Sequence, residues 1–324
     1  MTAATDEEPE LELSVVIPLL DEEGSLRELH EKLSAVLAEV GRSYEILFVD
    51  DGSTDGGPAI LAELAERDPR VGWIRFRRNF GKSAALDAGF ERARGSVVIT
   101  MDADLQDDPT EIPRFLEALE GGLDLVSGWK AKRHDPLGKT LPSKLFNFVV
   151  RRLSGLKLHD FNCGFKAYKR AALENLELYG DLHRYVPVLV DARGFRVGEL
   201  AVTHHARKHG RSKYGIGRMT RGFFDLLTVL LLTRYRRRPL HFFGGIGLLS
   251  TVAGVGCLAF LTARKLFWHE AIGHRPLLIL GLLLVVVGVQ LFCTGLLAEM
   301  INHLHGRRRY FIRDEHPPRA GEGA

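Results

Sequence analysis

Acidic turns that follow apolar segments carry the residues best suited to chemistry. The clearest is Asp102-Ala103-Asp104-Leu105-Gln106, which comes directly after the apolar segment 96–101. Carboxylates at positions i and i+2 just past a strand can converge on one cation, and Gln106 adds a neutral oxygen at the same spacing. A hard ion such as Mg²⁺ takes oxygen ligands and keeps positions open for phosphate. We therefore predict a metal site at Asp102, Asp104 and Gln106. The alternative is a solvated acidic turn, because two more aspartates follow.

Two other acidic turns, at 21–23 and 50–55, also follow apolar segments. A carboxylate at Asp50 or Asp51 can accept hydrogen bonds from a nucleotide base or from ribose hydroxyls. A cap on the following helix is the alternative explanation for the polar side chains of that turn, with Ser53 or Asp55 as the capping residue. Three acidic turns on one edge of a sheet would repel each other without a cation or polar ligand. The pattern therefore indicates a ligand-binding edge.

Alternating strands and helices must position these turns. Short apolar or β-branched segments lie at 13–17, 45–49, 71–76, 96–101 and 123–127. Several lack polar alternation, which is typical of strands buried on both faces of a parallel sheet. The leucines and valines between the first two segments recur at helical spacing. The pattern predicts an α/β fold with a Rossmann-like, mostly parallel sheet, whose ligands bind at the carboxyl ends of the strands.

Charge is divided unevenly along the chain. Residues 1–128 hold 12 Lys and Arg against 28 Asp and Glu, whereas the remainder holds 32 against 13. A split of this size indicates that the second part faces something anionic. The three cysteines are scattered, so they predict neither a disulfide framework nor a CxxC metal site. The acidic N-terminal segment has no apolar stretch and does not resemble a signal peptide.

Two uncharged segments near the C-terminus, 242–263 and 277–298, are each long enough to cross a bilayer as a helix. Buried core helices are the alternative. Four arginines precede the first segment and four follow the second, whereas the loop between them holds three basic residues. The positive-inside bias then places both termini in the cytoplasm. A small-residue face at Gly244, Gly247 and Gly254 can pack against another helix, so a homo-oligomer stays open.

As an ordered set, the motifs PLLDEE, VDDGSTD, RNFGKSAALDAGF and DADLQDDP resemble glycosyltransferase family 2. More closely, the chain resembles bacterial polyprenyl-phosphate glycosyltransferases of the dolichyl-phosphate mannose synthase, undecaprenyl-phosphate glucosyltransferase and formamido-arabinose transferase types. The similarity covers roughly residues 13–310 and implies a GT-A catalytic domain. We accordingly predict a disordered lead-in at 1–12, a GT-A domain at 13–215, an amphipathic interfacial helix at 216–238, a two-helix transmembrane hairpin at 239–304 and a cytoplasmic tail at 305–324.

The resemblance also implies roles for individual residues. Mg²⁺ or Mn²⁺ would be held by Asp104 and Gln106, next to a donor diphosphate at Asp102. The implied donor-binding residues are Pro18, Leu20, Glu22, Asp50, Asp51, Lys82, Asp102 and Ala103. The implied acceptor-phosphate residues are Lys130, Lys139 and Ser143, and the implied catalytic residues are Asp104, Asp160, Arg207 and Lys213. The chain departs from the family where Leu20-Asp21 replaces Tyr-Asn, and where Lys130 and Lys139 stand at positions that are more often Arg.

The function that this resemblance implies is the inverting transfer of a hexose from a nucleotide sugar to a polyprenyl monophosphate, either undecaprenyl or dolichyl phosphate. The first expected donor is UDP-glucose and the second is GDP-mannose. The reaction is placed at the cytoplasmic face of the bacterial inner membrane and supplies cell-envelope glycosylation, with no nucleic-acid partner. The alternatives are transfer of an aminosugar, such as formamido-arabinose or an N-acetylhexosamine, and a non-enzymatic membrane subunit that binds a lipid-linked sugar. A processive polysaccharide synthase is disfavoured, because no Q-x-x-R-W segment occurs.

Overall fold

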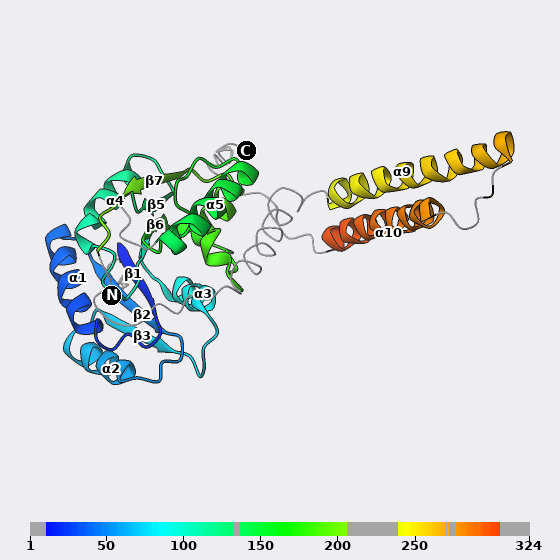
Figure 1. Ribbon diagram of the computed structural model, residues 1–324. Helices are drawn as coiled ribbons and strands as arrows, with labels where there is room; N and C mark the ends of the chain where they lie inside the picture. Colours follow the sequence, from blue (N-terminus) through cyan, green and yellow to red (C-terminus); the bar gives the residue numbers. More distant parts are fainter. Residues whose placement is uncertain (1–10, 132–136, 206–238, 270, 272–275, 305–324) are drawn as a thin grey trace, which may run out of the picture. The chain divides into compact units, whose positions relative to one another are not determined.

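The computed structural model describes residues 11–131, 137–205, 239–269, 271 and 276–304, and it describes the side chains of its fifth helix only from Phe146 onward. The chain forms two compact units, residues 1–229 and residues 230–324 (Figure 1). The predicted interfacial helix at 216–238 lies outside the described residues. The same is true of two predicted catalytic residues, Arg207 and Lys213.

One mixed sheet forms the centre of the first unit. Within the described residues its strand order is β3-β2-β1-β4-β6-β5-β7. Neighbouring strands are parallel except at β6, which runs antiparallel to both β4 and β5. The predicted mostly parallel sheet is therefore confirmed, and β6 is an addition that the sequence patterns did not predict. The strands are β1 (Leu13–Leu19), β2 (Tyr44–Asp50), β3 (Val71–Arg75), β4 (Val97–Thr100), β5 (Leu125–Trp129), β6 (Lys166–Lys169) and β7 (Val197–Ala201).

Helices cover both faces of this sheet (Figure 1). Helices α1 (Leu26–Val40), α2 (Gly57–Arg67) and α4 (Ile112–Glu120) share one hydrophobic cluster with alternate residues of β1 and β2. Helix α3 (Lys82–Arg92) lies on the opposite face, where a side chain at Gly89 would overlap Val16. The remaining elements of this unit are α5 (Leu137–Ser154), α6 (Arg170–Leu173), α7 (Val186–Asp191) and two short 3₁₀ turns, η1 (Pro109–Glu111) and η2 (Leu182–Arg184).

The sheet brings distant segments to one edge. Because β1, β2, β4 and β5 run in the same direction, their carboxyl ends meet there. Strand β6 runs the other way, so its first residue lies at that edge as well. Lys166 is the register partner of Thr100 in β4 and of Ser127 in β5. The three acidic turns and the residues around Lys166 therefore share one end of the sheet.

The second unit is a pair of long helices, α9 (Pro239–Trp268) and α10 (Pro276–Leu304). Both are long and apolar enough to cross a membrane. Large apolar side chains such as Leu249, Phe260 and Ile279 are mostly exposed on them, which a core helix of a soluble protein does not show. Both helices are therefore little buried within the described residues, and by length and composition they could span a membrane.

Glycines allow the backbones of α9 and α10 to approach closely. A Cβ built on Gly247 would lie 2.6 Å from the carbonyl oxygen of Gly288, and one on Gly254 would lie 2.7 Å from that of Gly281. The hydroxyl of Ser250 also donates to the carbonyl oxygen of Leu284 at 2.8 Å. The predicted small-residue face thus packs against the second helix of the same chain, as small residues do in membrane helix pairs.

This close packing predicts a difference between two glycine substitutions. Gly288→Ala places a Cβ 2.6 Å from the Gly247 carbonyl oxygen, so we expect a loss of about 1–3 kcal/mol in hairpin stability. Gly256 has nothing within 4 Å of a built Cβ. Gly256→Ala is therefore expected to be neutral or slightly stabilising, because alanine is the better helix former. Denaturant titration of the full chain in mixed micelles compares the two, and equal stability would contradict the packing described here.

Candidate active site

The acidic turns that follow β1 and β2, at 21–23 and 50–55, are joined by hydrogen bonds. The Oδ1 atom of Asp21 accepts the backbone N–H of Thr54 at 2.9 Å, and the N–H of Asp21 donates to the hydroxyl of Ser53 at 2.9 Å. Glu23 repeats this exchange, because its N–H donates to Asp55 and its carboxylate accepts from Gly56. Ser53 therefore joins the two turns and does not cap α2. These contacts hold the end of β1 against the end of β2.

Asp50 and Asp51 are both buried at the end of β2. Asp50 accepts the N–H of Ser53 at 2.8 Å and lies 3.3 Å from the guanidinium of Arg75. Asp51 accepts the backbone N–H groups of Phe80 at 2.7 Å and Gly81 at 2.9 Å. Burial raises the pKa of Asp51. Asp51 thus fixes the segment that begins α3, immediately before Lys82.

Asp102 is the first carboxylate after β4, and Lys82 is its ion-pair partner. Burial alone would raise the pKa of Asp102, but the charges of Lys82 and Lys130 lower it to about 2. Asp102 is therefore ionised at neutral pH. A Cβ built on Gly164 would lie 2.7 Å from both carboxylate oxygens of Asp102, so the backbone at Gly164 approaches this carboxylate closely.

Asp104 and Gln106 lie further along the same turn and have the chemistry of a divalent-cation site. The buried Asp104 accepts the backbone N–H of Gln106 at 3.2 Å. The Gln106 side-chain amide lies 3.4 Å from Nε2 of His204 and 3.3 Å from the carbonyl oxygen of His205. Carboxylate, amide and imidazole groups are ligands of Mg²⁺ or Mn²⁺. No group of three His, Cys, Asp or Glu side chains among the described residues is placed to hold a metal by itself. The residues thus fit an ion whose other ligands are water or phosphate oxygens.

Three further contacts join this turn to residues just beyond β5 and β7. Asp107 forms an isolated bridge with His204 just beyond β7, and its Oδ1 lies 3.5 Å from Nζ of Lys130 beyond β5. Nε2 of His205 lies 2.8 Å from Oδ2 of Asp108. Burial opposes the charge of Lys130, but Asp107 together with Asp102 and Asp160 raises its pKa. Lys130 therefore stays positively charged in the middle of an acidic cluster.

The segment 159–165 comes just before β6, and its residues 162–164 line a pocket together with Lys82. Asp160 is buried and accepts the N–H of Asn162 at 3.0 Å, while Asn147 of α5 accepts the N–H of Phe161 at 3.3 Å. Burial raises the pKa of the Cys163 thiol to about 12, so this cysteine is protonated at neutral pH. Cys163 is thus a packing residue and not a nucleophile.

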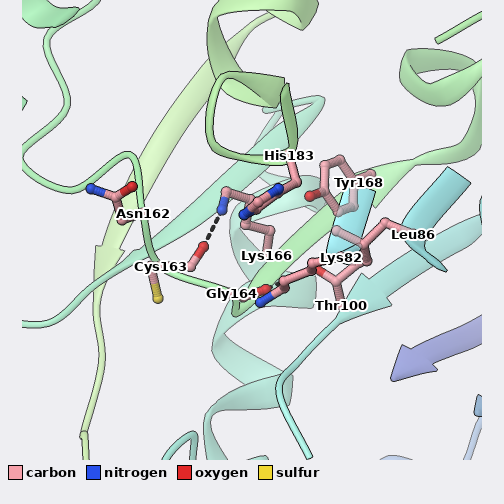
Figure 2. A pocket seen from close by; sticks show the side chains of 9 residues that line it. All are labelled: Lys82, Leu86, Thr100, Asn162, Cys163, Gly164, Lys166, Tyr168 and His183. Atoms are coloured by element: carbon pink, nitrogen blue, oxygen red, sulfur yellow. Dashed lines mark hydrogen bonds between the residues drawn. The ribbon is translucent and has the colours of Figure 1, made fainter. Parts of the chain in front are cut away.

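A pocket opens between this segment and α3 (Figure 2). The side chain of Lys166 lies in it and donates to the carbonyl oxygen of Cys163. Ser83 of α3 holds the imidazole of His183, with 2.9 Å between the Ser83 hydroxyl and Nδ1. The residues that line the pocket are Lys82, Leu86, Thr100, Asn162, Cys163, Gly164, Lys166, Tyr168 and His183.

The structure therefore brings most of the predicted site residues to one edge. Pro18 and Ala103 are buried there, and Leu20 and Glu22 are half-buried. Lys139 and Ser143 belong to α5, but their side chains lie outside the described residues. Sequence reasoning gave no role to Lys166, His183 or His204. Lys166 and His183 lie in the segments HDFNCGFK (159–166) and HRYVP (183–187), which resemble the D-x-x-C-G-F and H-R-[FY]-x-P segments of the polyprenyl-phosphate glycosyltransferases. That resemblance is the signal that points to them.

Comparison with known proteins identifies the family of the chain. Residues 14–177 match the model for "Glycosyl transferase family 2". The chain is 41% identical over 316 residues to a dodecaprenyl-phosphate galacturonate synthase of Rhizobium johnstonii, covering 95% of this chain and 91% of the relative. It is 38% identical over 306 residues to an undecaprenyl-phosphate 4-deoxy-4-formamido-L-arabinose transferase of Pseudomonas aeruginosa, covering 93% and 89%.

Solved structures share the fold of the first unit. Glucosyl-3-phosphoglycerate synthase from Mycobacterium tuberculosis, in complex with Mn²⁺ and UDP-glucose, aligns with a TM-score of 0.51 and 22% identity, covering 68% of this chain and 79% of that one. Its complex with Mn²⁺, UDP and phosphoglyceric acid gives a TM-score of 0.53 at 21% identity, covering 69% and 78%. At these identities the likeness concerns the fold alone, which is the predicted GT-A arrangement.

Proposed function

Because the chain belongs to glycosyl transferase family 2, we propose that it transfers a sugar from a nucleotide-sugar donor to a polyprenyl monophosphate. The relatives named above support this acceptor, since both carry a polyprenyl phosphate in their names and match nearly the whole chain. A membrane hairpin suits an enzyme whose acceptor lies in the bilayer. The predicted class, a glycosyltransferase, is confirmed by family membership.

The observation that carries the proposal is the arrangement at the Asp102–Gln106 turn. Gln106 contacts both Asp104 and His204, and these three residues would hold a divalent ion near the Lys82–Asp102 pair. Such an ion is what a nucleoside-diphosphate leaving group needs. Bound there, Mg²⁺ or Mn²⁺ would neutralise charge on the departing diphosphate. That chemistry also fits the names of the solved complexes with Mn²⁺ and UDP-glucose.

The protein's own residues then supply alignment and charge control. The oxygen of a phosphate monoester is already anionic at neutral pH, so the acceptor needs no strong general base. Lys130 stays charged and can attract that phosphate as a point charge, since lysine lacks the bidentate fork of arginine. The role that we propose for Asp160, which is buried and accepts the N–H of Asn162, is that of a carboxylate near the transferred sugar. An in-line displacement by the acceptor phosphate would invert the configuration at the anomeric carbon of the sugar.

The arginines that flank α9 and α10 favour a cytoplasmic catalytic unit, with the loop between the helices outside. We propose a bacterial inner-membrane enzyme on this basis. UDP-glucose and GDP-mannose remain predictions without support from the relatives named above. The formamido-arabinose alternative matches the name of one of them.

A donor panel tests the reaction. Purified full-length protein with Mg²⁺ or Mn²⁺ and undecaprenyl phosphate is expected to form a lipid-linked sugar from at least one nucleotide sugar. NMR of that product should show an anomeric configuration opposite to that of the donor. Retention would reject the in-line scheme, and the absence of any lipid-linked product across the panel would reject the acceptor.

A further inference from the structure

Lys166 is a buried lysine in the pocket beside the proposed metal site. Lys166 is only 3% exposed, because β6 lies between β4 and β5 in the middle of the sheet. The side chain nevertheless lines the pocket between α3 and the 162–164 segment (Figure 2). An ammonium group in such a place is rare unless a counter-charge accompanies it.

The surrounding contacts leave this charge without a carboxylate partner of its own. Among the residues that the structure describes, the printed contact of Lys166 Nζ is with the carbonyl oxygen of Cys163, and no carboxylate lies within ion-pair distance of it. The carboxylates whose charges act on Lys166 are Asp160 and Asp102, but neither forms an ion pair with it, and Asp102 binds Lys82 instead. Burial, reinforced by the charge of Lys82, lowers the pKa of Lys166. An anion that entered the pocket would remove this cost.

We propose that Lys166 binds a carboxylate carried by the sugar of the donor, so that the enzyme prefers a nucleoside-diphosphate uronic acid to the corresponding neutral hexose. This inference rests on the proposed function. Beyond Lys166, the pocket offers the Asn162 amide and the His183 imidazole, which are groups that bind sugar hydroxyls. A neutral sugar in the same place would leave the buried ammonium uncompensated.

The diphosphate of the donor is a less suitable occupant. In the proposed function, the diphosphate would instead contact a metal ion held by Asp104 and Gln106, further along the turn. A multiply charged phosphate in the pocket would also face the carboxylate of Asp102, whose backbone neighbour Gly164 forms part of the wall. A single carboxylate matches the single charge of the Lys166 ammonium group. The galacturonate in the name of one relative agrees with this chemistry.

Two donors that differ only at C6 give the sharpest test. UDP-galacturonate carries a carboxylate where UDP-galactose carries a hydroxymethyl group, and their diphosphates are identical. With undecaprenyl phosphate and the full-length enzyme, we expect kcat/KM for the uronate to exceed that for galactose by about 30-fold or more, as for one buried charge pair. Lys166→Met should reduce this ratio by a similar factor. Calorimetric titration of each donor without acceptor should show the same change in Kd ratio.

Lys169→Met is the matched control. Lys169 lies on the same strand but at the opposite edge of the sheet. There it is the register partner of Val97, and its ammonium group forms an ion pair with Asp124. This variant should keep the wild-type donor ratio. If Lys166→Met does not fold, as judged by its circular dichroism and melting, the wild-type ratio decides alone.

Three results would overturn the inference. The first is a wild-type enzyme that uses both donors equally well, and the second is a wild-type enzyme that prefers galactose. The third is a Lys166→Met enzyme that loses both donors in equal proportion, which would assign Lys166 to the shared diphosphate. Each of these still yields a lipid-linked sugar and so leaves the proposed function intact. Failure of every donor with undecaprenyl phosphate would instead refute the proposed function.

Discussion

Asp104→Ala is expected to lower kcat by about 1,000-fold or more, because it removes the buried carboxylate of the proposed metal site. A divalent ion held there would stabilise charge on the leaving diphosphate by about several kcal/mol, and each ~1.36 kcal/mol corresponds to a factor of about ten in rate. The measurement is single-turnover transfer to undecaprenyl phosphate with saturating donor. A chelator added to the wild-type enzyme should cause a comparable loss that excess Mg²⁺ or Mn²⁺ reverses.

Asp124→Asn is a suitable control for this variant. Asp124 is also a partly buried carboxylate, but it pairs with Lys169 and accepts the N–H of Arg196 at the far edge of the sheet. Its loss should lower stability slightly and leave kcat near the wild-type value. An Asp104→Ala enzyme that kept wild-type turnover, or a wild-type enzyme that ignored chelation, would contradict the metal site.

The sequence predicted the parallel part of the fold well, because each of its signals is local. The apolar segments at 13–17 and 45–49 agree with β1 and β2 to within two residues at either end, and the helical spacing from Leu26 to Val40 matches α1. The shared position of the acidic turns follows directly from strand direction, since parallel strands end at the same edge of the sheet. The same logic located Asp102, Asp104 and Gln106 together.

Strand β6 shows what such reasoning misses. It has four residues, and its pattern Lys166-Ala167-Tyr168-Lys169 contains two charges, so neither length nor composition indicates a strand buried in the middle of a sheet. Its place is decided by pairing with β4 and β5, which are distant in sequence. Without knowledge of β6, Lys166 cannot be placed at the edge of the sheet that holds the acidic turns. The pocket was therefore invisible to motif analysis.

The side-chain pairings within the site could not be predicted from the sequence either. Asp51 was expected to contact a nucleotide, and its carboxylate also accepts two backbone N–H groups that begin α3. Asp102 was expected at the diphosphate and the metal, and the structure adds Lys82 as its partner. Both contacts join residues separated by about one βα unit. Sequence spacing limits which residues can meet, but packing selects the partner.

Gly164→Ala is expected to lower kcat/KM by about 100-fold with only a small change in melting temperature. A Cβ at this position would lie 2.7 Å from both oxygens of Asp102, closer than any ordinary contact. Asp102 is ionised, because its pKa is about 2, and it holds Lys82 in place. The added methyl group must therefore displace the carboxylate, and with it the lysine. A displacement of about 1 Å in a positioning group can cost two orders of magnitude in rate.

The control for this substitution is Gly121→Ala at the end of α4, where the nearest atom to a built Cβ is 3.4 Å away and φ is −64°. The added methyl group is accommodated there, so activity should persist. Asp102→Asn provides the complementary test, because it keeps the shape of the side chain and removes the charge that holds Lys82. If Gly164→Ala acts by displacing Asp102, the double variant should be little worse than Asp102→Asn alone. Additive losses would mean that Gly164 affects catalysis through another neighbour, and full activity of Gly164→Ala would mean that the position of Asp102 does not matter for transfer.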